Sequence, residues 1–271
     1  MSLWAVTMVR DELDVLPYVL THLVNEGVDG MVIADNRSVD GTRRWLHEFA
    51  DEAPIPVDLI HDDEVAYYQS RKMSAYYQRA CEAGADWVIP FDADEVWYDA
   101  EGATLRDVFA RSWDADCLEV KVFNYFPTSA DPDPAVEPIP FRRITRRDPT
   151  MSILAKTAVR ANLPGLVITQ GNHEAHAAKA LRIIRPELEI GHFPWRSPEQ
   201  FERKARNGAE AYEAVDAGEV PADQGTHWRG YGRILRESGP MALRAVYDEW
   251  FHDPAIALEH KPVPWRELAP L

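Results

Sequence analysis

Three acidic residues follow directly on a short apolar run in the segment WVIPFDADEVW, residues 87–97: Asp92, Asp94 and Glu95. Carboxylates held close together repel one another and raise one another's pKa unless a cation lies between them. Oxygen ligands suit Mg²⁺ or Mn²⁺, which bind through one or two carboxylates and the phosphates of a substrate. The D-x-D spacing therefore predicts that Asp92 and Asp94 bind one of these metals. An acidic surface turn is the alternative, because the triplet alone is common.

Apolar runs rich in β-prone residues alternate with helical patterns in the first hundred residues. The expected strands are 3–9, 30–35, 55–63 and 86–94, and the expected helices lie within 13–29, 36–50 and 66–84. Gly27 and Gly84 are natural ends for two of these helices. Strands that alternate with helices predict a parallel sheet with right-handed crossovers, in an open α/β layer fold.

A cluster of polar residues lies at the C-terminal end of each of these four strands. The clusters are Arg10–Glu12, Asp35–Asn36, Asp62–Glu64 and Asp92–Glu95. In an open parallel sheet, ligands bind in the crevice outside the carboxyl ends of the strands. One such cluster is ordinary for a solvated loop, but four that converge on one edge of a sheet predict a ligand site.

The second half has a different pattern. Residues 116–126 and 188–195 are strand-like, whereas 128–140 is a loop rich in proline and aspartate. From Ser197 onward the chain is mostly helical, with Ser197 as the expected cap and Pro198 in the first turn. We expect a catalytic α/β domain over residues 1–196 and a helical C-terminal extension over 197–271 that packs on it.

The composition excludes several classes of protein. The 271 residues include 29 basic and 45 acidic side chains, a formal net charge of −16, which argues against a duplex nucleic-acid partner. Two cysteines are too few for a disulfide framework. Charged residues follow the N-terminus too soon for a signal peptide, and no apolar run approaches the roughly 20 residues of a membrane helix. We expect a cytoplasmic protein that reaches a membrane only through its acceptor; the oligomeric state is not predicted.

The segments VRDE, LPYVLTHLVNEGVDGMVIADNRSVDGT and GADWVIPFDADEVW, followed much later by HFPWRS, resemble glycosyltransferase family 2. The resemblance covers roughly residues 4–205, and its combination of motifs is more specific than any one of them. It implies a GT-A-type, Rossmann-like fold and a metal-dependent glycosyltransferase. The donor would be a sugar linked to UDP, GDP or dTDP, and the acceptor a hydroxyl group of unknown origin.

The resemblance also implies which residues bind the nucleotide-sugar. The end of the first strand, with Val9, Arg10 and Glu12, would border the nucleotide. Asp35 would contact the base or the ribose, and Arg71 would approach the pyrophosphate.

Asp92, Ala93 and Asp94 would lie at the diphosphate, with Mn²⁺ or Mg²⁺ held by the two aspartates. In the family a histidine on a later strand can add a metal ligand, and His192 has that place; His173 is the reserve.

The acceptor hydroxyl needs a general base near the anomeric carbon. Glu95, His173 and Glu174 are the candidates, and the sequence does not choose between them. The Q-x-x-R-W element of processive synthases is absent, which favours a single addition. We expect inversion, although the same sheet serves retaining enzymes.

Three alternative functions compete with this interpretation. A haloacid-dehalogenase-like phosphohydrolase places its D-x-D after the first strand, not the fourth. A nucleotidyltransferase needs a Gly-rich basic loop that VRDELDVLP lacks. A catalytically inactive carbohydrate-binding relative would have no need of Asp92, Asp94 and His192. Separately, the basic run RSPEQFERKARNG, which includes Lys204, could receive phosphate at a helix N-terminus or form a solvated face.

Overall fold

The computed structural model describes residues 1–271 except 153, 217–218, 221–223, 252–256, 265 and 267–271. Its centre is a curled sheet with the strand order β3-β2-β1-β4-β8-β6-β12-β5, and β11 pairs with β6 beside this path. The strands of the sheet are β1 (Leu3–Val9), β2 (Gly30–Asp35), β3 (Val57–His61), β4 (Trp87–Pro90), β5 (Glu95–Asp99), β6 (Cys117–Asn124), β8 (Lys156–Arg160), β11 (Ile183–Ile184) and β12 (Leu188–His192).

Helices cover both faces of this sheet, and short strand pairs flank it. The helices are α1 (Leu16–Asn25), α2 (Thr42–Glu52), α3 (Gln69–Glu82), α4 (Leu105–Arg111), α5 (Pro140–Arg143), η1 (Gln170–Asn172), α6 (Pro198–Glu213), α7 (Thr226–Ser238) and α8 (Pro240–Phe251). The flanking pairs are β9 (Val167–Ile168) with β10 (Ala175–His176), and β7 (Arg146–Arg147) with β13 (Glu259–His260). The expected α/β class, with a mostly parallel sheet and a helical C-terminal part, is confirmed.

The alternation of apolar residues in the strands buries both faces of the sheet. Leu3 and Ala5 belong to the core under α1, α2 and α4, whereas Trp4 and Val6 belong to the core under α3. The strands are therefore fixed on both sides, and their carboxyl ends form a rigid edge.

The parallel strands end level with one another. Val9 lies opposite Asp35, and Asp35 lies opposite His61. The neighbouring β4 ends at Pro90, which pairs with Val6. The acidic segment after Pro90 therefore runs beside the end of β1, as the strand-end clusters predicted.

The strand expected over residues 86–94 is shorter than the sequence suggested. It ends at Pro90, and a new strand, β5, begins at Glu95 after a turn in which the Glu95 amide donates to the Asp92 carbonyl at 3.0 Å. Only four residues separate β4 from β5, although three strands lie between them in the sheet order. This short connection requires the sheet to curl back on itself.

The curl brings the later strands to the acidic turn. In β12, which is antiparallel to β5 and parallel to β6, His192 lies opposite both Glu95 and Asn124. The Phe193 amide donates to the Asp94 carbonyl at 2.9 Å. Residues about 100 positions apart in the chain are thus brought to one end of the sheet.

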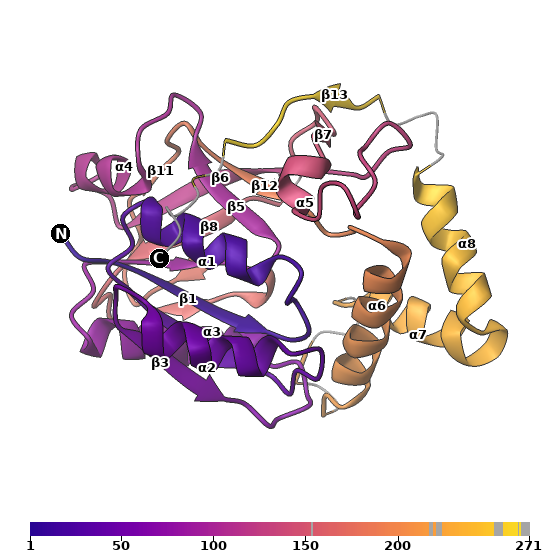
Figure 1. Ribbon diagram of the computed structural model, residues 1–271. Coiled ribbons are helices and arrows are strands. Elements are labelled where there is room, and N and C mark those ends of the chain that lie inside the picture. Colours follow the sequence, from indigo (N-terminus) through magenta and orange to yellow (C-terminus); the bar gives the residue numbers. More distant parts are fainter. Residues whose placement is uncertain (153, 217–218, 221–223, 252–256, 265, 267–271) are drawn as a thin grey trace.

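The last helices, α6 to α8, lie beyond the carboxyl end of β1 (Figure 1). They share a small core of Phe201, Ala205, Leu243 and Tyr247. The Ser197 side chain accepts a hydrogen bond from the Gln200 amide, so the expected cap of α6 is confirmed. After α8, β13 pairs with β7 in one of the strand pairs that flank the sheet. The domain boundary expected between residues 196 and 197 stays a prediction.

Among the described residues, no helix combines the length and apolar character that crossing a bilayer requires.

Candidate active site

Two cavities open at the carboxyl ends of the parallel strands and share part of their walls. The first, of about 320 Å³, lies against the ends of β1 and β2 and is also lined by α6. The second, of about 610 Å³, is lined by β6, β8 and the segment around η1. Asp92 and His192 line both cavities. These two residues therefore mark the junction of two chambers whose sizes suit small ligands.

Asp94 is a buried carboxylate in the wall of the first cavity, next to His192, and its Oδ2 atom faces three nitrogen groups. Lys204 of α6 forms an ion pair with it, and His192 Nε2 and Arg196 Nη1 each lie 3.7 Å away. Burial alone would raise the pKa of Asp94, but Lys204, His192 and Arg196 together hold it below its usual range. Asp94 is therefore ionised at neutral pH.

His192 presents an unprotonated nitrogen to Asp94. Its Nδ1 atom lies 2.8 Å from Asn124 Oδ1, and because an amide oxygen only accepts, Nδ1 carries the hydrogen and Nε2 keeps its lone pair. Burial lowers the pKa of His192 to about 4, which Asp94 only partly offsets. The imidazole is thus neutral at pH 7, the form that binds metals, and Asn124 fixes its orientation.

The pair Asp94 and His192 fits a divalent cation that also binds phosphate. Two ligands bonded at about 2.1 Å to one ion lie about 3.0 Å apart at right angles and at most about 4.2 Å apart, so 3.7 Å is compatible with a shared ion. No group of three or more His, Cys, Asp or Glu side chains is arranged around a metal position in the described part of the chain. The donor set therefore suits Mg²⁺ or Mn²⁺ with water and phosphate as its other ligands, rather than a closed protein cage.

Asp92 is held by a lysine from β8. Lys156 Nζ lies 2.5 Å from Asp92 Oδ2 and 2.7 Å from Glu95 Oε1, and burial of the ammonium is outweighed by these two carboxylates, which raise its pKa. Weaker hydrogen bonds of 3.4 and 3.3 Å reach Asp92 Oδ1 from Gln69 and Asn172. The Asp92 carboxylate is therefore held in place by side chains from β8, α3 and η1.

Glu95 is the second carboxylate paired with Lys156, and it lines neither of the two cavities. It is 1% exposed, and its Oε2 atom accepts a hydrogen bond from the Asp92 amide at 3.1 Å. Burial raises the pKa of Glu95 to about 7, against the lowering effect of Lys156. Through these contacts Glu95 holds the Lys156 ammonium and the backbone of the acidic turn in place.

Arg196 connects the end of β12 to the loop after β1. Its buried guanidinium forms ion pairs with Glu12 and Asp14 and donates to the Phe193 carbonyl at 2.9 Å. Burial raises the pKa of Glu12, and Arg196 and Lys204 oppose that rise. Because a buried charge must be paired, Arg196 ties the His192 segment to the first cavity.

His173 faces the second cavity with the same tautomer as His192. Its Nδ1 atom lies 2.9 Å from the Ala155 carbonyl, an acceptor, so the hydrogen is on Nδ1 and Nε2 is free. Burial and the nearby Lys156 lower the pKa of His173. The ring packs against Gly171, where a Cβ atom would lie 2.4 Å from Nε2. His173 is thus a neutral imidazole with a free base nitrogen.

The other residues named from the sequence divide into two groups. The first cavity is lined by Val9, Arg10, Glu12 and Ala93. The remaining three lie elsewhere: Asp35 is fully buried and paired with Arg43 at 2.5 Å, Arg71 pairs with Glu64 on the surface, and the Glu174 side chain is 70% exposed. The roles of all seven in binding or catalysis stay predictions.

Sequence reasoning missed Lys156 and Asn124 as parts of the site, and it noticed Arg196 only as a member of a basic run. Lys156 opens the run KTAVR, and Asn124 lies near the end of the expected strand 116–126, but neither position indicates which strand lies beside the acidic residues. Lys204 was noticed only as a member of a basic run. Its partner, Asp94, is 110 residues away.

Comparisons with known proteins gave structural matches alone. No known protein family matches the sequence, and no curated protein sequence does. The chain is similar to Staphylococcus aureus TarS 1–349 in complex with UDP, with 12% identity, 98% of each chain covered and a TM-score of 0.41.

Two further solved structures are similar at the same level. The mannosyltransferase PcManGT from Pyrobaculum calidifontis, in complex with GDP-Man and Mn²⁺, is 15% identical over 94% of this chain and 75% of its own, with a TM-score of 0.45. HddC from Yersinia pseudotuberculosis is 9% identical over 75% and 97%, with a TM-score of 0.40. Identities and TM-scores this low do not carry the activity of any of these proteins over to this chain.

The raised pKa of Glu95 predicts a pH-dependent stability. Between the ordinary value of 4.5 and about 7 the folded protein keeps a proton on Glu95 that the unfolded chain releases, so the free energy of unfolding falls as pH rises through this window. We expect Glu95→Gln to remove this decline. Relative to the wild type, the variant should gain about 2 kcal/mol between pH 5 and pH 7.5, measured by urea unfolding.

Glu174→Gln, at an exposed position, is the matched control and should follow the wild-type curve at both pH values. An equal stability difference between Glu95→Gln and the wild type at pH 5 and pH 7.5 would show that Glu95 is ionised in the folded protein throughout.

Proposed function

We propose that this chain is a glycosyltransferase that moves one sugar per reaction from a nucleotide diphosphate donor to an acceptor hydroxyl, with Mn²⁺ or Mg²⁺ and with inversion. One observation carries the proposal. An ionised carboxylate, Asp94, in the wall of the first cavity lies 3.7 Å from a neutral imidazole, His192, that lines both cavities. A transferase with two substrates and a metal-bound leaving group needs such an arrangement.

The donor would occupy the first cavity, at the ends of β1 and β2. Arg10 lines it, and its Nη2 atom pairs with Glu210 at 2.6 Å. Its buried Nε and Nη1 atoms have no hydrogen-bond partner among the described residues. Unsatisfied buried donors are costly in a protein, so these two atoms favour an anionic or carbonyl-bearing ligand here.

The metal would be held by Asp94 and His192, beside the diphosphate. When bound, it would neutralise the negative charge that develops on the departing nucleotide diphosphate. Asp92, kept in place by Lys156, lies at the junction of both cavities, where the sugar would bridge them.

The acceptor would enter through the second cavity, on the other side of this junction. His173 has its free Nε2 there and would take the proton of the attacking hydroxyl. With the diphosphate in one cavity and the hydroxyl in the other, attack comes from the side opposite the leaving group. That geometry favours inversion at the anomeric carbon.

The first test is donor binding. UDP-, GDP- and dTDP-sugars are screened by thermal shift with and without Mn²⁺, and a ligand at 100 times its Kd should add about 2.7 kcal/mol of stability. We expect the Mn²⁺-dependent shift to disappear in Asp94→Asn, because the amide lacks the charge that the cation requires.

Asp114→Asn is the matched control, since that carboxylate is paired with Arg182 away from both cavities. A full Mn²⁺-dependent shift in Asp94→Asn would remove this residue from the metal site. Hydrolysis of simple phosphoesters without any nucleotide-sugar binding would support a phosphohydrolase instead.

The second test separates the candidate bases. His173→Gln should lower kcat for sugar transfer by about 10²–10⁴-fold with little change in donor binding, because proton removal from the acceptor is lost. Glu174→Gln should keep wild-type kcat, because that side chain is exposed and lines neither cavity. Rates of transfer to the acceptor, once found by product analysis, are the measurement. A wild-type kcat in His173→Gln would exclude it as the base.

A further inference from the structure

We propose that Lys204 is an exchangeable counter-ion: it neutralises Asp94 in the free protein, a divalent cation displaces it, and the released ammonium then binds the phosphates of the donor. This inference rests on the proposed function, because it assigns a role to one more residue of the same site. It predicts that the cation and the nucleotide diphosphate help each other to bind.

Lys204 holds the side of Asp94 that faces the first cavity. Its ammonium forms an ion pair with Asp94 Oδ2, the same oxygen that lies 3.7 Å from the free nitrogen of His192. A cation shared by Asp94 and His192 must bond to that oxygen or its partner and would meet the ammonium at close range. Two positive charges at one carboxylate repel, so the cation and Lys204 exclude each other.

Lys204 is also the group that is able to leave. Arg196, the other permanent cation at Asp94, is 1% exposed in its side chain and is fixed by Glu12 and Asp14. The Lys204 side chain is 24% exposed, and its second partner, Glu12, is 3.6 Å away. A lysine on a flexible four-carbon stem can therefore move where the buried arginine cannot.

The first cavity offers the displaced ammonium of Lys204 a second binding position. Lys204 lines the first cavity, together with Asn207 and Gly208 on the next turn of α6. Phosphate groups of a donor in that cavity would give the ammonium a new partner, and lysine binds phosphate as a point charge. Without such an anion the exchange leaves an unpaired charge, so the cation alone should bind weakly.

The two binding events are therefore coupled. The new contact between the ammonium and the diphosphate offsets the loss of the Lys204–Asp94 ion pair, so the diphosphate strengthens cation binding. By linkage, the cation strengthens diphosphate binding by the same factor. Direct bonds between the metal and the phosphates also couple the two events, so the contribution of Lys204 is the part of the coupling that is lost when its charge is removed.

The experiment measures Mn²⁺ binding by electron paramagnetic resonance, with and without UDP or GDP, in the wild type and in Lys204→Gln. Because the ammonium no longer competes, we expect Lys204→Gln to bind Mn²⁺ alone about tenfold more tightly, the size of one hydrogen-bonded charge contact. The enhancement of Mn²⁺ affinity by the nucleoside diphosphate should shrink by a similar factor. Lys204→Arg keeps the charge and should retain weak binding of Mn²⁺ alone.

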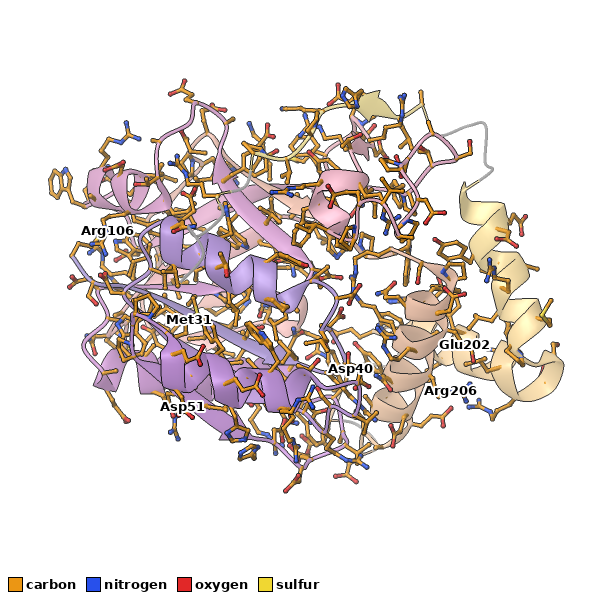
Figure 2. The ribbon with its side chains drawn as sticks, in the orientation of Figure 1. Met31, Asp40, Asp51, Arg106, Glu202 and Arg206 are labelled. Carbon is orange, nitrogen blue, oxygen red and sulfur yellow. The ribbon has the colours of Figure 1, made fainter. Side chains whose placement is uncertain are left out.

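Arg206→Gln is the matched control. Arg206 lies on the same helix, is exposed and pairs with Glu202 at 2.8 Å, and both side chains are labelled on α6 in Figure 2. It should leave Mn²⁺ binding unchanged.

Equal Mn²⁺ affinity in the wild type and Lys204→Gln, with affinity still lost in Asp94→Asn, would overturn the exchange and leave the proposed function intact. Mn²⁺ binding that survives in Asp94→Asn would remove Asp94 from the metal site and would overturn the exchange with it.

Discussion

The structure depends on the pairing of charges that are buried at one end of the sheet. Glu12, Asp94 and Glu95 are each at most 9% exposed, in a protein that already carries a net charge of −16. Removing carboxylates from water costs several kcal/mol each unless cations accompany them. Lys156, Arg196 and Lys204 supply the positive charges, and each comes from a different part of the chain. The fold must therefore bring β8, the end of β12 and α6 to the same place.

This constraint explains why the site is built from the whole chain. The parallel strands provide the acids, the curl of the sheet provides His192, and α6 provides Lys204. A compact pairing of acids and bases keeps the site folded without a ligand. It also keeps Asp94 ionised, while burial keeps His192 neutral, and these are the forms that a divalent cation requires. The same interactions thus serve stability and the proposed chemistry.

Much of the first half could be predicted from the sequence, because its signals are local. The strands over residues 3–9 and 30–35 have the expected bounds, and the Ser197 cap is present. His192 was proposed as a partner of the acids from the family resemblance, and it lies beside Asp94. The strands and the cap could be predicted from periodicity and capping, which a short window of residues reveals, whereas His192 was predicted from the resemblance alone.

The rest could not be predicted, because it depends on contacts between distant segments. Nothing near Glu95 in the sequence shows that a new strand begins there and buries it. Lys156 meets Asp92 across 64 residues, through antiparallel pairing of β8 with β4 and β6. Charge pairing of this kind is decided by the topology, not by the local pattern.

A crystal structure with Mn²⁺ and the nucleoside diphosphate selected by the binding screen tests the central claim most directly. The anomalous signal of manganese locates the ion independently of the protein atoms. We expect an ion within about 2.1–2.4 Å of Asp94 and His192 Nε2, with phosphate oxygens among its other ligands. An ion elsewhere, or a diphosphate outside the first cavity with Lys204 still paired to Asp94, would contradict this expectation.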